Sequence, residues 1–513
     1  MADDWQPPGD TVSACIASWA AVTPDARALL GIAGPEFTYA ELWAFMNHVR
    51  DELAAAGIGR TERVVLALPD GVVPAAMMLA TMRAAVATPV NPALPLPEAQ
   101  TILDSLTPRA LIVPVGMPTA FCAAAAASGI AVLEIDEHGF LLPGPVTGSQ
   151  PTAFEAEPDP DDLALILLTS GTTDRPRRVP VRHRSLLDVC TLRARARKLS
   201  PADRGLNSAP ASFVVGISRT IEPLITGGST VVVTGADLLA FPEAVSRLRP
   251  TWAWFAPALL ESIVTAAERH SAFKEWPLRA VRVGGGRLPA DLAARAEALW
   301  GAPPLIGYGT TEVLGYIAAE EEIDRFPRKP GSVGQVRPEL SLVIRSPEGE
   351  ALATGEPGEI TVQPGDLFSG YLDDPEATAA VFFDGGWYRT GDLGYLDADG
   401  YLFVTGRVRE MINRGGQKIA PHEIDDALRA HPDVADAAAF GLPDKRLGED
   451  VAAAVVVRNG AETTALGLRH WVAERLAPHK IPHKIWFVPE LPRTASGKIQ
   501  RGALTTRFQD EDG

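Results

Sequence analysis

Short apolar runs alternate with longer helical patterns along the N-terminal part of the chain. Residues 63–68 form a β-like run, and a helix-like pattern follows over residues 73–85. Such alternation is typical of parallel sheets that are covered by helices. Further apolar runs predict strands at residues 110–115, 130–135, 163–168, 230–234 and 280–283. The pattern therefore predicts an α/β fold for this part of the chain.

The pattern changes after Gly331, where short apolar segments are interrupted by Gly, Pro and Asp. This pattern of short apolar segments and turn residues indicates a small β subdomain. Its strands are predicted at residues 340–344, 358–362 and 401–404. Beyond Gly406 the patterns predict a helix over residues 421–430 and a strand over residues 451–457. This last part has the size of a separate α+β domain of roughly 100 residues.

The length of the chain, 513 residues, exceeds the roughly 250 to 300 residues at which one hydrophobic core stops growing, so more than one domain is expected. Hydrophobic residues make up 46% of the chain and charged residues 22%, which is ordinary for a packed globular protein. The net charge of -17 argues against nucleic acid as a partner, because generic affinity for a phosphate backbone comes from Lys and Arg. A local basic cluster can still bind a nucleotide.

Signals for export and membrane insertion are not found in the sequence. Residues 1–10 carry acids and prolines where a signal peptide has basic and apolar residues. The Ala-rich stretch at residues 121–132 is shorter than the about 20 apolar residues that span a bilayer. The three cysteines have neither metal-like nor paired spacing, as expected for core residues in a reducing compartment. We expect a cytoplasmic protein with no membrane partner.

A loop rich in Gly, Thr and Arg follows the predicted strand at residues 163–168. Its candidate nucleotide-binding residues are Thr169, Ser170, Gly171, Thr172, Thr173 and Arg177. Hydroxyls and glycine N–H groups allow a polyphosphate to approach closely, and arginine adds charge-assisted hydrogen bonds. The Gly-Lys-Ser/Thr ending of a Walker loop is absent. Taken alone, the segment is explained equally well as a solvated polar turn.

This loop closely resembles the signature loop of the adenylate-forming superfamily, which contains acyl-CoA synthetases, aryl-acid activating enzymes, nonribosomal adenylation domains and luciferases. The family usually has Gly at the position of Asp174 and Lys at the position of Arg177. The resemblance implies an α/β fold class with a large N-terminal domain over residues 1–408, made of two parallel-rich α/β subdomains plus a small β subdomain. It also implies a mobile α+β C-terminal domain over residues 409–513.

A second motif, from Gly307 to Glu312, resembles the family's aromatic-Gly-x-Thr-Glu motif. The resemblance implies that Tyr308 stacks on adenine and Thr311 contacts the α-phosphate. It also implies that Glu312 and Thr172 bind Mg²⁺, a cation that prefers oxygen ligands. The structural alternative for this motif is a loop with a capping box. Further nucleotide-binding residues implied by the resemblance are Gly285, Gly286, Arg287, Gly307, Gly309 and Thr310.

A third motif, from Tyr388 to Asp392, resembles the segment with which the family binds ribose. The resemblance implies that Asp392 accepts hydrogen bonds from both ribose hydroxyls, and a two-oxygen acceptor suits a vicinal diol. By the same resemblance, Val404 and Arg407 contact the nucleotide. Arg409 occupies the position of the hinge between the two domains.

Two loops of the C-terminal part resemble those that the family uses in its two half-reactions. The loop implied to line the pantetheine tunnel contains Arg414, Gly415, Gly416 and Lys418. The run from Leu491 to Arg501 resembles the last family motif, in which Lys498 bridges the acid's carboxylate and the α-phosphate. An ammonium placed there neutralises charge that develops as the carboxylate attacks. The implied catalytic residues are Lys498, Thr311, Glu312 and Arg407.

The acyl pocket is implied by position in the same family pattern. Its residues are Phe213, Val214, Ser218, Trp254, Phe255, Gly284, Gly286, Gly307, Val313 and Leu314. Phe213 stands where many acyl-CoA relatives carry His. Arg219, within an otherwise apolar segment, is expected either to pair with a polar or acidic substituent of the substrate or to form a structural salt bridge. Both interpretations predict a buried arginine.

These resemblances imply an ATP-dependent ligase that activates a small carboxylic acid as an acyl-AMP, releases pyrophosphate and transfers the acyl group to the thiol of coenzyme A. ATP, Mg²⁺ and CoA are the expected cofactors, and a monomer or homodimer is expected. Alternative acceptors are a carrier protein and an amine, and an alternative acid is nitrite for diazotisation. A nucleotide-sensing protein without turnover is the non-enzymatic alternative, against which the retained Glu312 and Lys498 argue.

Overall fold

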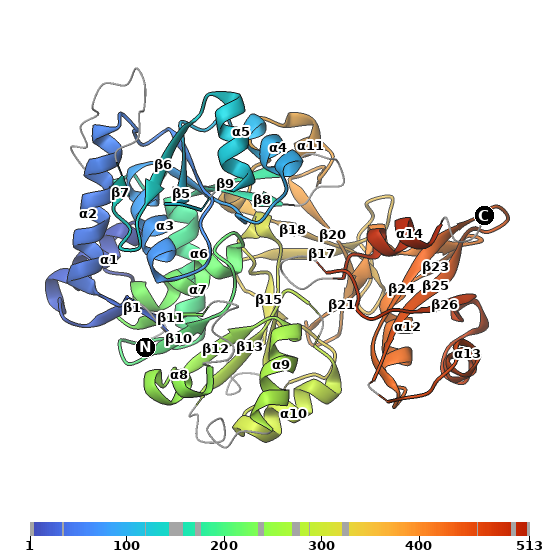
Figure 1. Ribbon diagram of the computed structural model, residues 1–513. Coiled ribbons are helices and arrows are strands. Elements are labelled where there is room, and N and C mark those ends of the chain that lie inside the picture. Colours follow the sequence, from blue (N-terminus) through green and yellow to red (C-terminus); the bar gives the residue numbers. More distant parts are fainter. Residues whose placement is uncertain are drawn as a thin grey trace. The chain divides into compact units, whose positions relative to one another are not determined.

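The chain forms two compact units in the computed structural model (Figure 1). The structure describes residues 5–32, 35–117, 119–142, 157–169, 176–233, 241–268, 278–286, 288–320, 328–458, 460–493 and 499–509. Unit 1 comprises Met1–Gly284, Ala290–Pro327 and Pro364–Ala380, and unit 2 comprises Gly285–Pro289, Arg328–Gln363 and Val381–Gly513. The expected α/β class is confirmed. The boundary at residues 408 and 409 stays a prediction.

The first sheet of unit 1 has the strand order β7-β6-β5-β3-β4-β8-β9. Its strands are β3 (Arg63–Leu66), β4 (Val86–Pro89), β5 (Ala110–Pro114), β6 (Ala131–Ile135), β7 (Leu141–Leu142), β8 (Leu163–Thr169) and β9 (Arg177–Arg182). The inner strands pair in parallel, whereas β7 and β9 run antiparallel to their neighbours. Helices α4 (Leu96–Leu106) and α5 (Ala120–Ser128) share a buried core with this sheet, in which Leu103 and Phe121 pack with Leu111.

The helix α3 (Val72–Ala84) is apolar except for Thr81 and Arg83, and its position explains why. All of its residues except Pro74 are buried. It contacts β4 and β8 of the first sheet and also β1 (Arg27–Gly31), which belongs to the second sheet of unit 1. A helix that is hydrophobic on every side needs to be covered on every side. In unit 1, α3 therefore lies in a helical layer shared by two sheets (Figure 1).

The second sheet of unit 1 has the strand order β15-β14-β13-β12-β10-β11-β1-β2. Its other strands are β2 (Phe37–Thr38), β10 (Arg204–Asn207), β11 (Ser229–Val232), β12 (Trp252–Phe255), β13 (Ala280–Val283), β14 (Leu305–Tyr308) and β15 (Ala318–Ala319). Helices of this unit are α1 (Val12–Val22), α2 (Tyr39–Ala55), α6 (His183–Ala196), α7 (Val214–Ile225), α8 (Phe241–Leu248), α9 (Pro257–Ala267), α10 (Ala290–Trp300) and α11 (Pro375–Ala379). Strands β10, β12, β13 and β14 are parallel, so the loops that follow them meet at one edge, where ligands bind in open α/β sheets.

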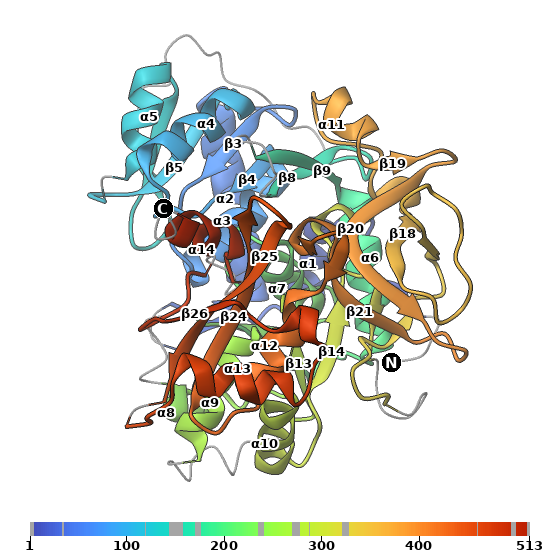
Figure 2. The same ribbon diagram turned by 90° about the vertical axis from the view of Figure 1, so that its right-hand side faces the viewer.

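Unit 2 contains a small antiparallel sheet, which confirms the expected β subdomain. Its strands are β17 (Ser341–Arg345), β18 (Gly358–Gln363), β19 (Phe382–Phe383), β20 (Trp387–Leu396) and β21 (Leu402–Arg407), with β16 (Gln335–Val336) elsewhere in the same unit. Figure 2 shows β20 as a long strand beside β18 and β21. The register between β20 and β21 places Asp392 directly opposite Arg407.

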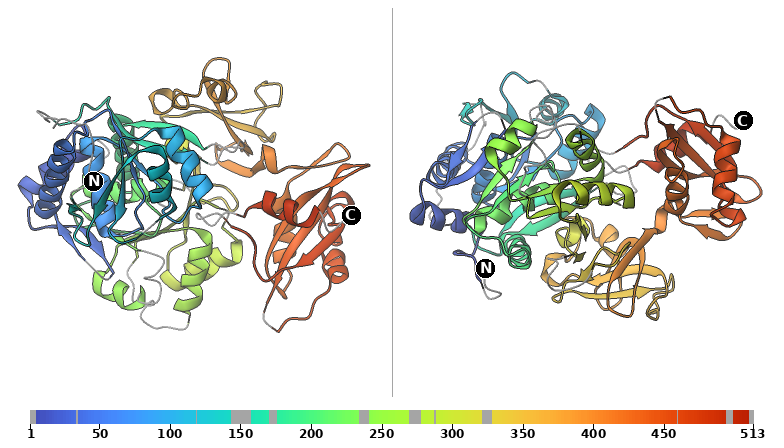
Figure 3. Two further views of the ribbon diagram at one scale, coloured as in Figure 1. Left: turned by 45° about the horizontal axis from the view of Figure 1, so that its top comes forward. Right: turned by 90° about the horizontal axis from the view of Figure 1, so that it is seen from below.

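The last hundred or so residues, within the usual range of domain sizes, build a separate α+β core in unit 2 (Figure 3). Its elements are β22 (Ile412–Arg414), β23 (Gln417–Ile419), α12 (Pro421–Arg429), β24 (Val434–Asp444), β25 (Gly448–Val457), α13 (Ala465–Ala473), β26 (Lys484–Phe487) and α14 (Arg501–Gln509). Alternate residues of β24 point to opposite faces: Ala437 and Ala439 join the core with α12 and α13, while Ala438 and Phe440 join the core with α14. Both faces of this sheet are covered.

Within the described ranges, every helix is too short or too polar to cross a bilayer.

Candidate active site

The motif at the end of β14, from Gly307 to Glu312, forms a tight loop with no room for a side chain at Gly309. A Cβ atom at Gly309 would lie 2.3 Å from the carbonyl carbon of Gly315, so this glycine is required by backbone packing. A 3₁₀ turn over Thr311–Val313 follows, and Leu314 adopts a left-handed φ of 54°. The N–H of Gly315 donates to the carbonyl of Thr310 at 2.7 Å, which closes the loop. Non-glycine residues in this region of φ and ψ are strained and gather at functional sites.

Tyr371 links Glu312 and Arg177 in a three-residue contact that the sequence did not predict. The Tyr371 hydroxyl donates a 2.8 Å hydrogen bond to Glu312 Oε1, and both residues are buried. Arg177 Nη1 donates to the Tyr371 oxygen at 3.2 Å, and its guanidinium lies 5.0 Å from the centre of the Tyr371 ring. Burial, and then the neighbouring Glu312 carboxylate, raise the pKa of Tyr371 above its ordinary value. The tyrosine therefore stays a hydrogen-bond donor at neutral pH.

The donors around this motif fit a magnesium nucleotide. One carboxylate oxygen of Glu312 accepts from Tyr371, and a carboxylate is among the hard oxygen ligands that Mg²⁺ prefers. The hydroxyl oxygen of Thr310 is buried and has no hydrogen-bond partner among the described residues. A buried hydroxyl without a partner is costly unless a ligand satisfies it.

The loop predicted to bind the phosphates of a nucleotide lies between two antiparallel strands of the first sheet. Thr169 ends β8 and Arg177 begins β9, and the two residues face each other in the register of the strands. Several predicted residues lie outside the described residues, namely Ser170, Gly171, Thr172, Thr173, Asp174, Arg287 and Lys498.

The motif predicted to bind ribose, from Tyr388 to Asp392, lies on paired strands of unit 2. Arg407 Nε forms a 2.9 Å ion pair with Asp392 Oδ1, and Asp392 is 5% exposed whereas the Arg407 side chain is half exposed. The Thr390 hydroxyl donates to the carbonyl of Ile360 and accepts from the N–H of Asp392, which fixes the backbone of the aspartate. Val404, the residue opposite Gly394, is half-buried on β21. The structure thus brings two predicted nucleotide-binding residues, Asp392 and Arg407, into direct contact.

The residues predicted for the acyl pocket occupy the ends of strands and the start of α7 in unit 1. Phe213 is the N-cap residue of α7, and Val214, Trp254, Phe255, Val313 and Leu314 are buried. Gly284 follows β13, and a Cβ atom there would lie 3.2 Å from Trp254 Nε1. The Ser218 hydroxyl donates to the carbonyl of Val215 in its own helix. Gly307 is exposed at the end of β14, and Gly285 and Gly286 are exposed in unit 2.

Arg219 is buried, as both interpretations of the sequence required. Its Nη1 donates to the two carboxylate oxygens of Glu222 at 2.5 and 2.7 Å. The structural salt bridge expected as one alternative is therefore present, and Glu222 is the partner that the sequence did not single out.

The loop with Gly415 and Gly416 is a two-residue hairpin turn between β22 and β23. Its flanking residues Arg414 and Gln417 are paired in register, and both glycines have positive φ, 58° and 86°. Such a turn requires positive φ at both central positions, which explains the Gly-Gly sequence. Arg414 Nε pairs with Asp450 at 2.5 Å, whereas Lys418 is exposed. Arg409 is exposed in a short 3₁₀ turn, Val408–Glu410.

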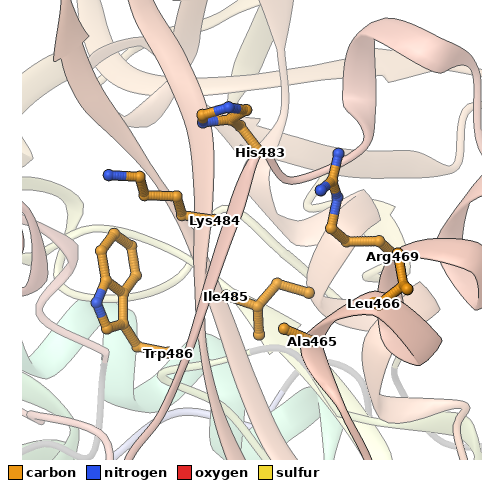
Figure 4. A pocket seen from close by; sticks show the side chains of 7 residues that line it. All are labelled: Ala465, Leu466, Arg469, His483, Lys484, Ile485 and Trp486. Atoms are coloured by element: carbon orange, nitrogen blue, oxygen red, sulfur yellow. The ribbon is translucent and has the colours of Figure 1, made fainter.

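A cavity of about 520 Å³ lies between α13 and β26 in unit 2 (Figure 4). Arg469, His483, Lys484 and Trp486 are among the residues that line it. None of the predicted site residues that the structure describes lines this cavity.

Comparison with known proteins identifies the class of this chain. The AMP-binding enzyme family matches residues 16–372, and the AMP-binding enzyme C-terminal domain matches residues 423–498. The chain therefore belongs to the AMP-binding enzyme family. It is an AMP-forming acid–thiol ligase of the acyl-CoA synthetase type, as the sequence motifs predicted.

Similar proteins cover nearly the whole chain. A probable CoA ligase of Humulus lupulus is 34% identical over 97% of this chain and 96% of the relative. An oxalate–CoA ligase of Arabidopsis thaliana is 32% identical over 98% of this chain and 99% of the relative. Among solved structures, ATP-bound MatB from Rhodopseudomonas palustris is 28% identical, with a TM-score of 0.86 over 98% of this chain and 100% of that chain.

Proposed function

We propose that this chain adenylates a small carboxylic acid with Mg-ATP, releasing pyrophosphate, and then transfers the acyl group to the thiol of CoA. The observation that carries the proposal is Glu312, a buried carboxylate whose orientation is fixed by the Tyr371 hydroxyl. Two residues earlier in the same motif, the buried Thr310 hydroxyl has no hydrogen-bond partner among the described residues. The acid named for the Arabidopsis relative, oxalate, supports a small carboxylic acid as the substrate.

In the first half-reaction, the residues of this chain bind and orient reactants and supply no covalent nucleophile. Glu312 would hold Mg²⁺, which neutralises phosphate charge when bound. Asp392 would accept hydrogen bonds from the ribose hydroxyls, while its ion pair with Arg407 orients the carboxylate. Lys498 would neutralise the charge that develops between the attacking carboxylate and the α-phosphate. Catalysis of this kind consists of positioning and electrostatic stabilisation.

In the second half-reaction, the hairpin turn at Gly415 and Gly416 would guide the thiol of CoA to the acyl-AMP. We propose that residues 409–513 rotate about Arg409 between the two half-reactions, so that Lys498 serves the first and the hairpin turn serves the second. Such domain movements commonly gate multistep enzymes.

The acid and the acceptor are tested in two separate assays. Acid-dependent exchange of labelled pyrophosphate into ATP is measured first over a panel of small carboxylic acids and nitrite. CoA, a phosphopantetheinylated carrier protein and amines are then compared as acceptors for the acyl-AMP. We expect exchange with at least one small carboxylic acid and fast AMP release with CoA. Binding of ATP without pyrophosphate exchange for any acid contradicts the proposal and favours a nucleotide-sensing protein. If AMP is released faster with a carrier protein or an amine than with CoA, that acceptor is the substrate of the second half-reaction.

A valine at Gly416 is expected to slow transfer to CoA about tenfold or more while pyrophosphate exchange stays unchanged. A β-branched residue at a φ of 86° is strained by roughly 1 to 3 kcal/mol, which distorts the hairpin turn. The two half-reactions are measured separately with Gly416→Val. Gly460→Val is the matched control, because Gly460 has a φ of 79° in another turn of the same domain with open space around its Cα. Equal losses in both half-reactions, or the same loss in the control, contradict the role of the hairpin turn.

A further inference from the structure

Three arginines and one glutamate form a buried cluster in unit 1, which we call the arginine cluster: Arg193, Arg197, Arg219 and Glu222. Arg193 lies on α6 and Arg197 caps the C-terminal end of that helix, while Arg219 and Glu222 lie one turn apart on α7. The exposed fractions of the four side chains are 1%, 4%, 8% and 0%, in that order. Helices α6 and α7 pack against each other (Figure 1), and ion pairs of the cluster join them.

Glu222 accepts hydrogen bonds from all three arginines. Arg193 Nη1 lies 3.4 Å from Glu222 Oε1, Arg197 Nη1 is paired with Oε2, and Arg219 Nη1 contacts both oxygens. Although burial alone would raise the pKa of Glu222, the arginines lower it below its ordinary value. The glutamate is therefore ionised and its acceptor capacity is used by this cluster.

The charges of the arginine cluster do not balance within the part of the chain that the structure describes. Three guanidinium groups share a single carboxylate, and a buried charge without a counter-charge is strongly unfavourable. Both hydrogen bonds that Arg219 donates to described residues leave from Nη1, and the buried Nε atoms of all three arginines lack a hydrogen-bond partner among those residues. Burial, and then the neighbouring Arg197, lower the pKa of Arg219. An anion that accepts from Arg219 would relieve both the unpaired charge and the unpaired donor.

The arginine cluster borders the segments predicted to form the acyl pocket. Arg193 Nη2 donates to the carbonyl of Leu314 at 2.6 Å. A Cβ atom at Gly315 would lie 3.3 Å from Arg193 Nη2 and 3.4 Å from Val214 Cγ1, so the cluster and the start of α7 meet at this loop. Arg219 itself is five residues after Val214 on the same helix.

We propose that Arg219 binds a second anionic group of the acid, so that the preferred substrates are small acids with a carboxylate or sulfonate in addition to the carboxylate that is adenylated. The planar edge formed by Nε and Nη2 matches two oxygens of such a group. This inference rests on the proposed function, because it names the substrate class of the same site.

A purely structural cluster makes a different prediction from a substrate-binding cluster. Glu222 retains two arginines when Arg219 is removed, so its buried charge stays compensated. A structural role of Arg219 predicts lower stability with unchanged substrate preference. A binding role predicts that the preference for dianionic acids is lost.

The test compares matched acids that differ in the second charge: malonate with propionate, succinate with butyrate, and sulfoacetate with acetate. For each acid, kcat/KM for pyrophosphate release is measured with the wild-type protein and with Arg219→Met. We expect the wild-type protein to prefer the dianion of at least one pair by about tenfold or more, as for a hydrogen-bonded charge. Arg219→Met should abolish that preference, chiefly by raising KM for the dianion, with little change for the monoanion.

The matched control is Arg197→Met, which removes the same charge from the same cluster at the end of α6. Its melting temperature should fall, while the ratio of kcat/KM between dianion and monoanion stays at the wild-type value. Arg219→Lys keeps the charge without the planar edge, and its ratio should lie between those of the wild type and Arg219→Met.

Two results overturn the proposal: a wild-type protein that uses the monoanion of every pair as well as the dianion, or equal changes of the ratio in the Arg219 and Arg197 variants. If Arg219→Met does not fold, the proposal is tested with the ratio of kcat/KM between dianion and monoanion in the wild-type protein and in Arg219→Lys. Absence of pyrophosphate release with every acid, charged once or twice, contradicts the proposed function instead, so the two failures are distinguishable.

Discussion

Replacing Lys498 by alanine should lower acid-dependent pyrophosphate exchange by about 100-fold or more, while CoA still reacts with supplied acyl-AMP. The expected size is that of removing one preorganised group that stabilises developing charge in a transition state. The residue lies in the segment from Leu491 to Arg501, which matches the last motif of the family in sequence. The two half-reactions are measured separately, exchange with labelled ATP and thiolysis with synthetic acyl-AMP.

Lys445→Ala serves as the control for this variant, because Lys445 is an exposed lysine of the same C-terminal domain. It should retain both half-reactions. Equal loss of exchange and thiolysis in Lys498→Ala would show that the lysine serves both steps or supports the fold, and the proposed division of work between the two loops would be wrong.

The substitution Glu312→Gln should decrease pyrophosphate exchange by more than 100-fold, because it removes the charge of the proposed metal ligand. The substitution Tyr371→Phe should decrease the apparent affinity for Mg²⁺ by roughly 10- to 100-fold. It keeps the charge of Glu312 but removes the 2.8 Å hydrogen bond that orients this carboxylate, and loss of such an outer partner typically costs 10- to 100-fold in metal affinity or activity. The rate of exchange is measured over a range of Mg²⁺ concentrations.

High Mg²⁺ should restore most of the rate of Tyr371→Phe and little of the rate of Glu312→Gln. Glu137→Gln is the control, since the side chain of Glu137 is 88% exposed in unit 1. A Tyr371→Phe protein with the wild-type Mg²⁺ dependence would contradict the positioning role of the tyrosine, and an active Glu312→Gln protein would place the metal ligand elsewhere.

Strands and helices in the buried layers agreed well with their sequence patterns. The strand predicted at residues 280–283 is β13, and the helix predicted over residues 73–85 is α3, shifted by one residue. The predicted ends of antiparallel strands were less accurate. Strand β25 begins at Gly448 and not at residue 451, and β21 ends at Arg407 and not at residue 404. Pairing with β24 and β20 extends these strands through polar residues, and the apolar pattern does not report such pairing.

The sequence alone predicted the class of enzyme and the order of its motifs, because each motif is a short contiguous segment that resembles a motif of the family. Only the tertiary structure determined which side chains orient these residues. Tyr371 lies 59 positions from Glu312, and the arginine cluster joins residues of two helices, so neither contact leaves a periodic or local pattern. Partners of buried charges are selected by packing between distant elements, and this selection is visible only once the chain is folded.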